Sequence, residues 1–165
     1  MPLWLNRKQL TMSEKLIFIT NDDGIDAPGI NTLISIAKEF GKIIVVTPDG
    51  EKSGMSHAVT VKNPLRIKKH IMKDDYELYI SNGTPVDCVK LAMHRLLNKK
   101  PDLLLSGINH GANSSVNIFY SGTMAAVIEG CMLQIPSIGF SSLHNSYDFD
   151  MSVYEKDIKH LISKI

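Results

Sequence analysis

Three short runs made entirely of apolar residues constrain the fold more than any other feature of this sequence. They span residues 16–19, 43–46 and 103–105, and each is followed by polar residues. A strand that is apolar on both faces is typical of a parallel sheet covered by helices on both sides. The segments between the runs include stretches with helical spacing of apolar residues. This alternation predicts an α/β domain with a largely parallel sheet.

Proline, glycine and threonine mark where several of these elements begin or end. Pro28 suits the first position of a helix, and Gly41 suits the residue that terminates it. Thr84 and Pro85 form a strong helix start, with a capping hydroxyl before the proline. Further helices are expected over residues 123–133 and 153–165, a strand over 137–140, and an antiparallel arm at the sheet edge from segments 58–61, 65–67 and 76–80.

Composition excludes several classes of partner and location. The net charge is +1, so no long-range field favours a nucleic-acid polymer or a membrane surface. No apolar run is long enough to span a bilayer, and the first residues lack the pattern of a secretory signal. Cys88 and Cys131 fall in expected helix interiors without metal-binding spacing, which predicts buried, reduced thiols and a cytoplasmic location.

Polar loops follow the expected strands directly. Ligands of open parallel sheets bind beyond the carboxyl ends of the strands, so these loops should share one rim. The first loop carries the adjacent carboxylates Asp22 and Asp23. A divalent cation such as Mg²⁺ or Mn²⁺ would relieve their repulsion. The alternative is a solvated turn that caps the following helix.

The other loops offer neutral oxygen atoms and backbone N–H groups. Ser53 can ligate a metal or contact phosphate, and the Asn109 carbonyl oxygen can complete a site with two carboxylates. The segment 120–123 begins a helix and suits an anion. His57 and His110 could donate a proton to a leaving group or contact phosphate. For each feature the alternative is a structural one: a polar turn, a helix cap or a satisfied histidine.

Taken together, these motifs resemble the SurE family of stationary-phase survival 5′/3′-nucleotidases. The resemblance covers about residues 15–142, with the motifs in the family's order and spacing. They are residues 19–29 (ITNDDGIDAPG), Ser53-Gly54 with Thr60, residues 82–89 (NGTPVDCV), residues 106–113 (SGINHGAN) and residues 120–123 (YSGT).

The resemblance implies a Rossmann-like, three-layer fold and hydrolysis of nucleoside 5′- and 3′-monophosphates, with short polyphosphate as a further substrate of some members. It implies one divalent cation, Mg²⁺ or Mn²⁺, held by Asp22, Asp23, Ser53 and Asn109, with Asp22, Asp23 and Asn109 acting in catalysis through the metal. Phosphate contacts are expected from Gly54, Asn113, Ser121, Gly122 and Thr123. A homodimer or homotetramer is implied for the full-length form.

The resemblance also sets the expected domain boundaries. Residues 1–14 precede the family's usual start and are expected to be an N-terminal extension, followed by a nucleotidase domain over residues 15–165. Family members usually run further than Ile165, so a C-terminal truncation is expected. The alternative function is a noncatalytic nucleotide- or metal-binding module, or an inactive fragment of the enzyme. A dinucleotide-dependent oxidoreductase is disfavoured because no GxGxxG motif follows the first strand.

Overall fold

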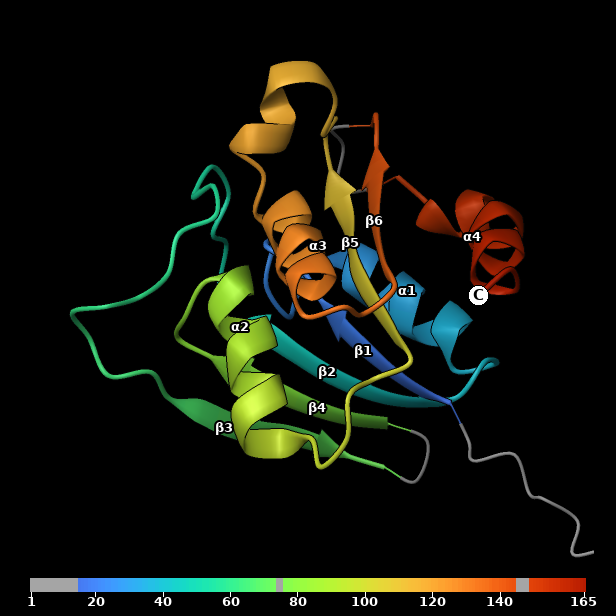
Figure 1. Ribbon diagram of the computed structural model, residues 1–165. Helices are drawn as coiled ribbons and strands as arrows, with labels where there is room; N and C mark the ends of the chain where they lie inside the picture. Colours follow the sequence, from blue (N-terminus) through green and yellow to red (C-terminus); the bar gives the residue numbers. More distant parts are fainter. Residues whose placement is uncertain (1–14, 74–75, 145–148) are drawn as a thin grey trace, which may run out of the picture.

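A sheet of six strands, with helices on both faces, forms the centre of the computed structural model (Figure 1). The structure describes residues 15–73, 76–144 and 149–165, so the expected extension over residues 1–14 lies outside the described residues. The strand order is β3-β4-β2-β1-β5-β6. The strands are β1 (Leu16–Thr20), β2 (Lys42–Pro48), β3 (Ile67–Met72), β4 (Tyr76–Ser81), β5 (Leu103–His110) and β6 (Ser137–Ser142).

Helices α1 and α4 cover one face of the sheet, and α2 and α3 cover the other. Their bounds are α1 (Pro28–Ala37), α2 (Pro85–Leu91), α3 (Gly122–Met132) and α4 (Glu155–Ile162), joined by a π-helical turn, η1 (Ala92–Leu96), and two 3₁₀ turns, η2 (Ser115–Phe119) and η3 (Met151–Tyr154). The α/β fold expected from the apolar runs is therefore confirmed.

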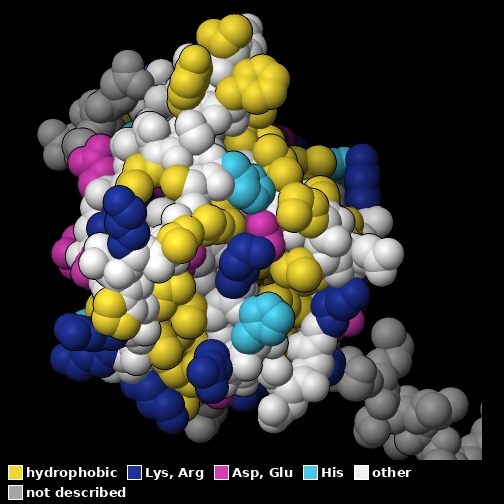
Figure 2. All heavy atoms as spheres, turned by 60° about the vertical axis from the view of Figure 1, so that its left-hand side comes forward, with side chains coloured by type: hydrophobic (Ala, Val, Ile, Leu, Met, Phe, Trp, Pro, Cys, Tyr) yellow, Lys and Arg dark blue, Asp and Glu magenta, His cyan; other side chains and the backbone are white. Residues whose placement is uncertain are grey.

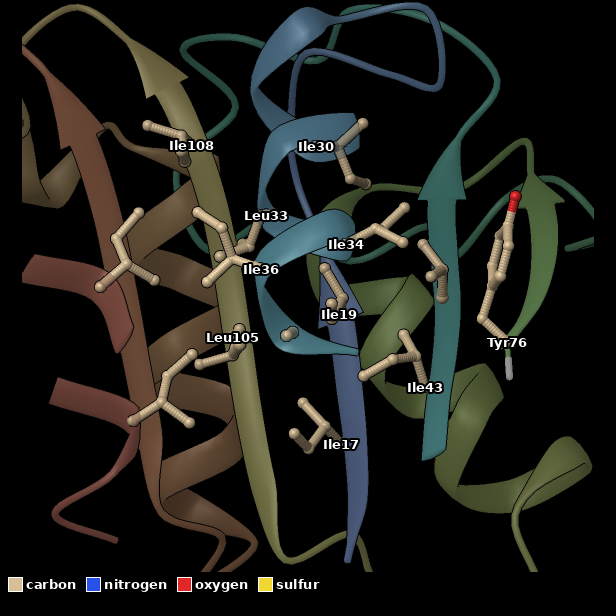
Figure 3. Packing of buried hydrophobic residues seen from close by; sticks show 14 of the residues in the cluster. Ile17, Ile19, Ile30, Leu33, Ile34, Ile36, Ile43, Tyr76, Leu105 and Ile108 are labelled. Atoms are coloured by element: carbon tan, nitrogen blue, oxygen red, sulfur yellow. The ribbon is translucent and has the colours of Figure 1, made fainter. Parts of the chain in front are cut away.

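The core on the α1 side explains why the apolar runs form the central strands. Ile17 and Ile19 of β1 point toward Ile30 and Leu33 of α1, with Ile43 of β2 beside them (Figure 3). All five side chains are at most 1% exposed. Because β1 is also buried on its other face, through Leu16 and Phe18 against α2 and α3, it has no polar position until its end.

The helix start predicted at Thr84 is present in full. The Thr84 hydroxyl accepts a hydrogen bond from the N–H of Asp87, and the Asp87 carboxylate accepts one from the N–H of Thr84. This reciprocal capping box satisfies two donors of the first helical turn. Thr84 and Pro85 therefore set the beginning of α2 as the sequence indicates.

The antiparallel arm predicted from three extended segments is wrong in part. Only β3 runs antiparallel, against β4, while β4 itself pairs parallel with β2. Residues 58–61 form no strand. The carbonyl of Ala58 accepts from the Thr84 hydroxyl, and the N–H of Thr60 donates to the Asp87 carboxylate, so side chains of α2's first turn take the bonds that a neighbouring strand would take.

Two smaller expectations also change. Cys88 is buried as predicted, whereas Cys131 is exposed on α3. Strand β5 continues past the expected end at residue 105 as far as His110, with a register shift against β6 between Ser106 and Asn109. In the part of the chain that the structure describes, no helix is both long and apolar enough to cross a membrane.

Candidate metal and phosphate site

Loops from separate parts of the chain surround a hollow of about 220 Å³ beyond the carboxyl ends of β1, β2 and β5. Six of the predicted site residues line it: Asp22, Ser53, Gly54, Asn109, Asn113 and Ser121. Three others, Asp23, Gly122 and Thr123, are not among its lining residues. The lining residues lie far apart in the sequence, and the fold of the sheet brings them together.

The Asp22 carboxylate is held by the first turn of α3. Asp22 is 3% exposed, and the Thr123 hydroxyl donates a hydrogen bond of 2.6 Å to its Oδ1 atom. Burial raises the pKa of Asp22, and hydrogen bonds from Thr123 and from the backbone N–H of Gly122 oppose that rise. Gly122 has to be a glycine for this approach, because a Cβ there would lie 2.7 Å from the Cβ of Asp22.

The Asp23 carboxylate has one oxygen atom without a partner. Its Oδ2 atom is buried and accepts no hydrogen bond from the residues that the structure describes. Burial, and then the charge of Asp22, raise the pKa of Asp23 to about 7, although the backbone N–H of His110 lowers it in part. A buried oxygen without a partner is costly. A divalent cation between Asp22 and Asp23 would satisfy it.

Two hydrogen bonds donated by its amide nitrogen fix the Asn109 side chain. Its amide group donates hydrogen bonds of 3.1 and 2.8 Å to the backbone carbonyls of His110 and Gly111. These bonds occupy the N–H groups, so the carbonyl oxygen is the polar atom left to the hollow that Asn109 lines. The neighbouring Gly107 has a φ of 125°, a backbone conformation that glycine tolerates without strain.

Ser53 belongs to the long loop between β2 and β3, and hydrogen bonds tie this part of the loop to the other walls. The N–H of Lys52 donates to the Asp22 carbonyl at 2.7 Å. The N–H of Ser56 donates to the Tyr120 carbonyl at 3.0 Å. Ser53 itself is exposed and lines the hollow with Gly54, whose φ is 72°. The serine hydroxyl is therefore presented by a loop with fixed neighbours.

Two residues at the start of α3, Ser121 and Thr123, make different contacts at the site. Ser121 lines the hollow, and its hydroxyl oxygen caps the helix by accepting a bond from the N–H of Met124. Thr123 is fully buried and spends its hydroxyl on Asp22. The side chain of Thr123 thus contacts a predicted metal ligand, whereas Ser121 and Asn113 line the hollow itself.

The donor set fits a hard divalent cation. Two carboxylates, a hydroxyl and an amide oxygen are the ligand types that Mg²⁺ and Mn²⁺ take in proteins. Among the described residues that line the hollow there is no lysine or arginine, and Lys52 pairs with Asp49 at 3.3 Å. A phosphate group beside Asp22 and Asp23 would therefore be repelled unless a cation lay between them.

The two histidines have different surroundings. His110 lines the hollow, and burial lowers its pKa, which disfavours the protonated ring that a general acid requires. His57 is not a lining residue; its Nε2 atom lies 3.1 Å from the Glu129 carboxylate of α3. This contact with Glu129 agrees with the structural alternative for His57, a histidine satisfied by a neighbouring group.

Sequence reasoning did not predict that two buried carboxylates, Asp87 and Glu129, anchor the Ser53 loop. Glu129 is 2% exposed and contacts His57 and Lys90, and Asp87 is 2% exposed and accepts bonds from Thr60. The signal for Glu129 was present in the helical spacing, since it lies on the buried face of α3 with Ala125 and Ala126, where an acid requires a partner.

Comparisons with known proteins identify a family and several relatives of this chain. The family described as "Survival protein SurE" matches residues 17–165. A protein of Christiangramia forsetii named "5'-nucleotidase SurE" is 47% identical over 158 residues, which cover 94% of this chain and 61% of the relative. A Flavobacterium johnsoniae protein of the same name is 51% identical and covers 91% of this chain and 57% of the relative.

A solved structure has the same fold. The crystal structure of the SurE protein from Aquifex aeolicus superimposes with a TM-score of 0.80 at 39% identity, covering 90% of this chain and 59% of that one. The chain thus spans about 60% of the length of the relatives that it matches.

Proposed function

The chain belongs to the SurE family, and we propose that it carries a metal-dependent centre for the hydrolysis of nucleoside monophosphates to nucleoside and phosphate. The names of the curated relatives support a 5′-nucleotidase. Activity on 3′-monophosphates and on the ends of short polyphosphates is part of the proposal and rests on the resemblance alone. The dimeric or tetrameric assembly and the cytoplasmic location also remain predictions.

One observation supports the proposal above all: carboxylate, hydroxyl and amide oxygens from distant loops line one hollow beside a buried carboxylate oxygen that has no described partner. We assign Asp22, Asp23, Ser53 and Asn109 to holding a divalent cation, Mg²⁺ or Mn²⁺. When bound, such a cation supplies positive charge against the transferring phosphoryl group and activates the attacking water.

The chain's own residues would orient the phosphate group. Ser121 and Asn113 carry polar side chains into the hollow, and Gly54 brings backbone close to it without a side chain. Positioning of this kind, together with charge stabilisation, supplies most of the catalysis in phosphoryl transfer. Gly122 and Thr123 would serve the same reaction indirectly, because their hydrogen bonds hold the Asp22 carboxylate in place.

The direct test is phosphate release from a panel of nucleoside 5′- and 3′-monophosphates with Mn²⁺, with Mg²⁺ and with EDTA. Asp22→Asn is expected to abolish metal-dependent release, since the amide removes a charge that the cation requires. Asp26→Asn is the matched control, because Asp26 lies on the same loop but is exposed and does not line the hollow.

The outcomes separate the two functions considered for the sequence. Release that depends on metal and is lost only in Asp22→Asn supports the enzyme. Near-normal turnover in Asp22→Asn contradicts the assignment of the site. Binding of metal and nucleotide by the unaltered chain, without any release of phosphate, would favour the noncatalytic module.

A further inference from the structure

Tyr120 stands at the hollow next to the groups proposed to hold phosphate. It lines the hollow with Asn113 and Asn117, and it directly precedes Ser121. Consecutive Cα atoms lie about 3.8 Å apart, so the tyrosine is one residue step from the proposed phosphate subsite. In a nucleoside monophosphate the ribose separates the base from the phosphate, so a base subsite is expected next to the phosphate subsite.

Exposure distinguishes this tyrosine from a core aromatic residue. Tyr120 is 61% exposed, whereas the next residue, Ser121, is 7% exposed. The preceding 3₁₀ turn η2 projects beyond the sheet, and hydrophobic side chains gather on this end of the molecule (Figures 1 and 2). Val116 and Phe119 of η2 are 66% and 76% exposed. Of the three exposed side chains Val116, Phe119 and Tyr120, only that of Tyr120 lines the hollow.

The backbone beneath the ring is fixed on both sides. The N–H of Tyr120 donates to the Asn117 carbonyl at 3.1 Å, which closes η2. Its carbonyl accepts from the N–H of Ser56, three residues after Ser53. Tyr120 therefore joins the η2 turn to the loop of a proposed metal ligand, and its position relative to the site is set before any substrate binds.

The side chains that line the hollow with Tyr120 suit a neutral, flat ligand group such as a nucleobase. Asn117 carries an amide that can donate to and accept from the edge of a base, and none of the described residues that line the hollow is a lysine or arginine. An aromatic ring presents a face on which every nucleobase can stack, largely irrespective of sequence. These properties would favour a nucleotide over a phosphate ester without a base.

We propose that Tyr120 forms the base subsite of this centre and stacks on the nucleobase of the substrate. The inference rests on the proposed nucleotidase function and adds the residue that selects nucleotides from other phosphomonoesters. Because the contact is made by a ring face, the four common ribonucleoside monophosphates are all accepted, with purines favoured by their larger stacking area.

The test compares nucleotides with D-ribose 5-phosphate, which keeps the sugar and phosphate but lacks the base. Tyr120→Ala is expected to lower the ratio of kcat/KM for AMP to kcat/KM for ribose 5-phosphate about tenfold, the loss of about 1.4 kcal/mol of stacking. Tyr120→Phe should keep the ratio, since it keeps the ring. Phe119→Ala is the matched control, because Phe119 is exposed on the same turn and does not line the hollow.

Two kinetic results would overturn the base subsite while leaving the nucleotidase intact. One is an unchanged ratio in Tyr120→Ala. The other is an equal fall for AMP and ribose 5-phosphate, which would make the ring a support for the phosphate site. A shift in oligomeric state shared by Tyr120→Ala and Phe119→Ala on a sizing column would identify a protein interface and also overturn the proposal.

A binding measurement keeps the inference testable if no phosphate is released from any ester, which would instead refute the proposed function. Adenosine carries the base without the phosphate, so its saturation-transfer NMR signal reports the base subsite alone. The signal is expected with the unaltered protein and with Tyr120→Phe, and should be lost with Tyr120→Ala. Equal signals from all three proteins would contradict the assignment.

Discussion

Asp22 and Asp23 are neighbours in the sequence but have different partners in the fold. Asp22 accepts hydrogen bonds from the first turn of α3, while Asp23 keeps a buried oxygen for which the described residues offer no donor. The sequence identifies the pair but not this difference, because Thr123 lies 101 residues from Asp22. The arrangement gives one carboxylate a fixed orientation and leaves the other with a buried oxygen that the proposed cation would satisfy.

The hydrogen bond from Thr123 to Asp22 should determine how well the site binds metal. Partners that orient a metal ligand typically account for 10- to 100-fold in metal affinity. Thr123→Val keeps the shape of the side chain but removes the hydroxyl, so we expect the affinity for Mn²⁺ to fall about 10- to 100-fold in calorimetric titrations.

Thr123→Ser is the control for this prediction, because it restores the donor while removing only a methyl group. It should bind Mn²⁺ with nearly the affinity of the unaltered chain. Equal affinities for Thr123→Val and the unaltered chain would show that the hydroxyl does not position Asp22 for metal.

Between β2 and β3 the chain runs as a long loop without regular structure, yet it is anchored at several points. Two of these anchors are buried carboxylates: Asp87 contacts Thr60 of the loop, and Glu129 contacts His57 of the loop. Glu129 also accepts a bond of 2.7 Å from Lys90 of α2. The loop that presents Ser53 is thus held by the helices of one face of the sheet.

Glu129 should make stability depend on pH. Burial alone would raise its pKa, but the hydrogen bonds from Lys90 and His57 outweigh burial, so the pKa of Glu129 lies below its ordinary value of 4.5. A lowered pKa in the folded state adds stability above the ordinary value, and this stability is lost as the pH falls through the folded value. Because Lys90 and His57 are partly exposed, we expect only about 1 kcal/mol.

Urea unfolding of Glu129→Gln at pH 7 and at pH 3 measures this contribution. The substitution is expected to lower the free energy of unfolding at pH 7, and the difference from the unaltered chain should shrink at pH 3. Glu155→Gln is the control, because Glu155 forms an exposed pair with Lys159 on α4. A difference that is the same at both pH values would contradict an ionised Glu129 as the source.

Elements were predictable from the sequence where burial alone determines them. The apolar runs gave β1, β2 and β5, and the Thr84-Pro85 signal gave α2, because these patterns depend on local spacing and capping. Residues 58–61 misled the interpretation, since their backbone groups bond to side chains of Thr84 and Asp87 rather than to a strand. Hydrogen bonds of this kind join residues that are distant in sequence, so they leave no local sequence pattern.

The sheet as a whole explains why the site lies where it does. β1 is central, with β2 on one side and β5 on the other, so the loops after these strands diverge around one crevice. The shared rim was predictable from the rule for open parallel sheets, because the polar loops follow the expected strands directly, whereas the strand order came from the structure. The roles of individual residues came from the family resemblance, because spacing alone cannot distinguish a metal ligand from a polar turn.

The central claim is that Asp22, Asp23, Ser53 and Asn109 together bind one divalent cation. Crystals of the protein soaked in MnCl₂ test it most directly, through anomalous scattering of manganese. We predict one strong peak in direct coordination with oxygen atoms of these four side chains, and its loss in Asp23→Asn but not in Asp26→Asn. A site without a peak in the unaltered protein, or manganese bound only at other carboxylates, would contradict the claim.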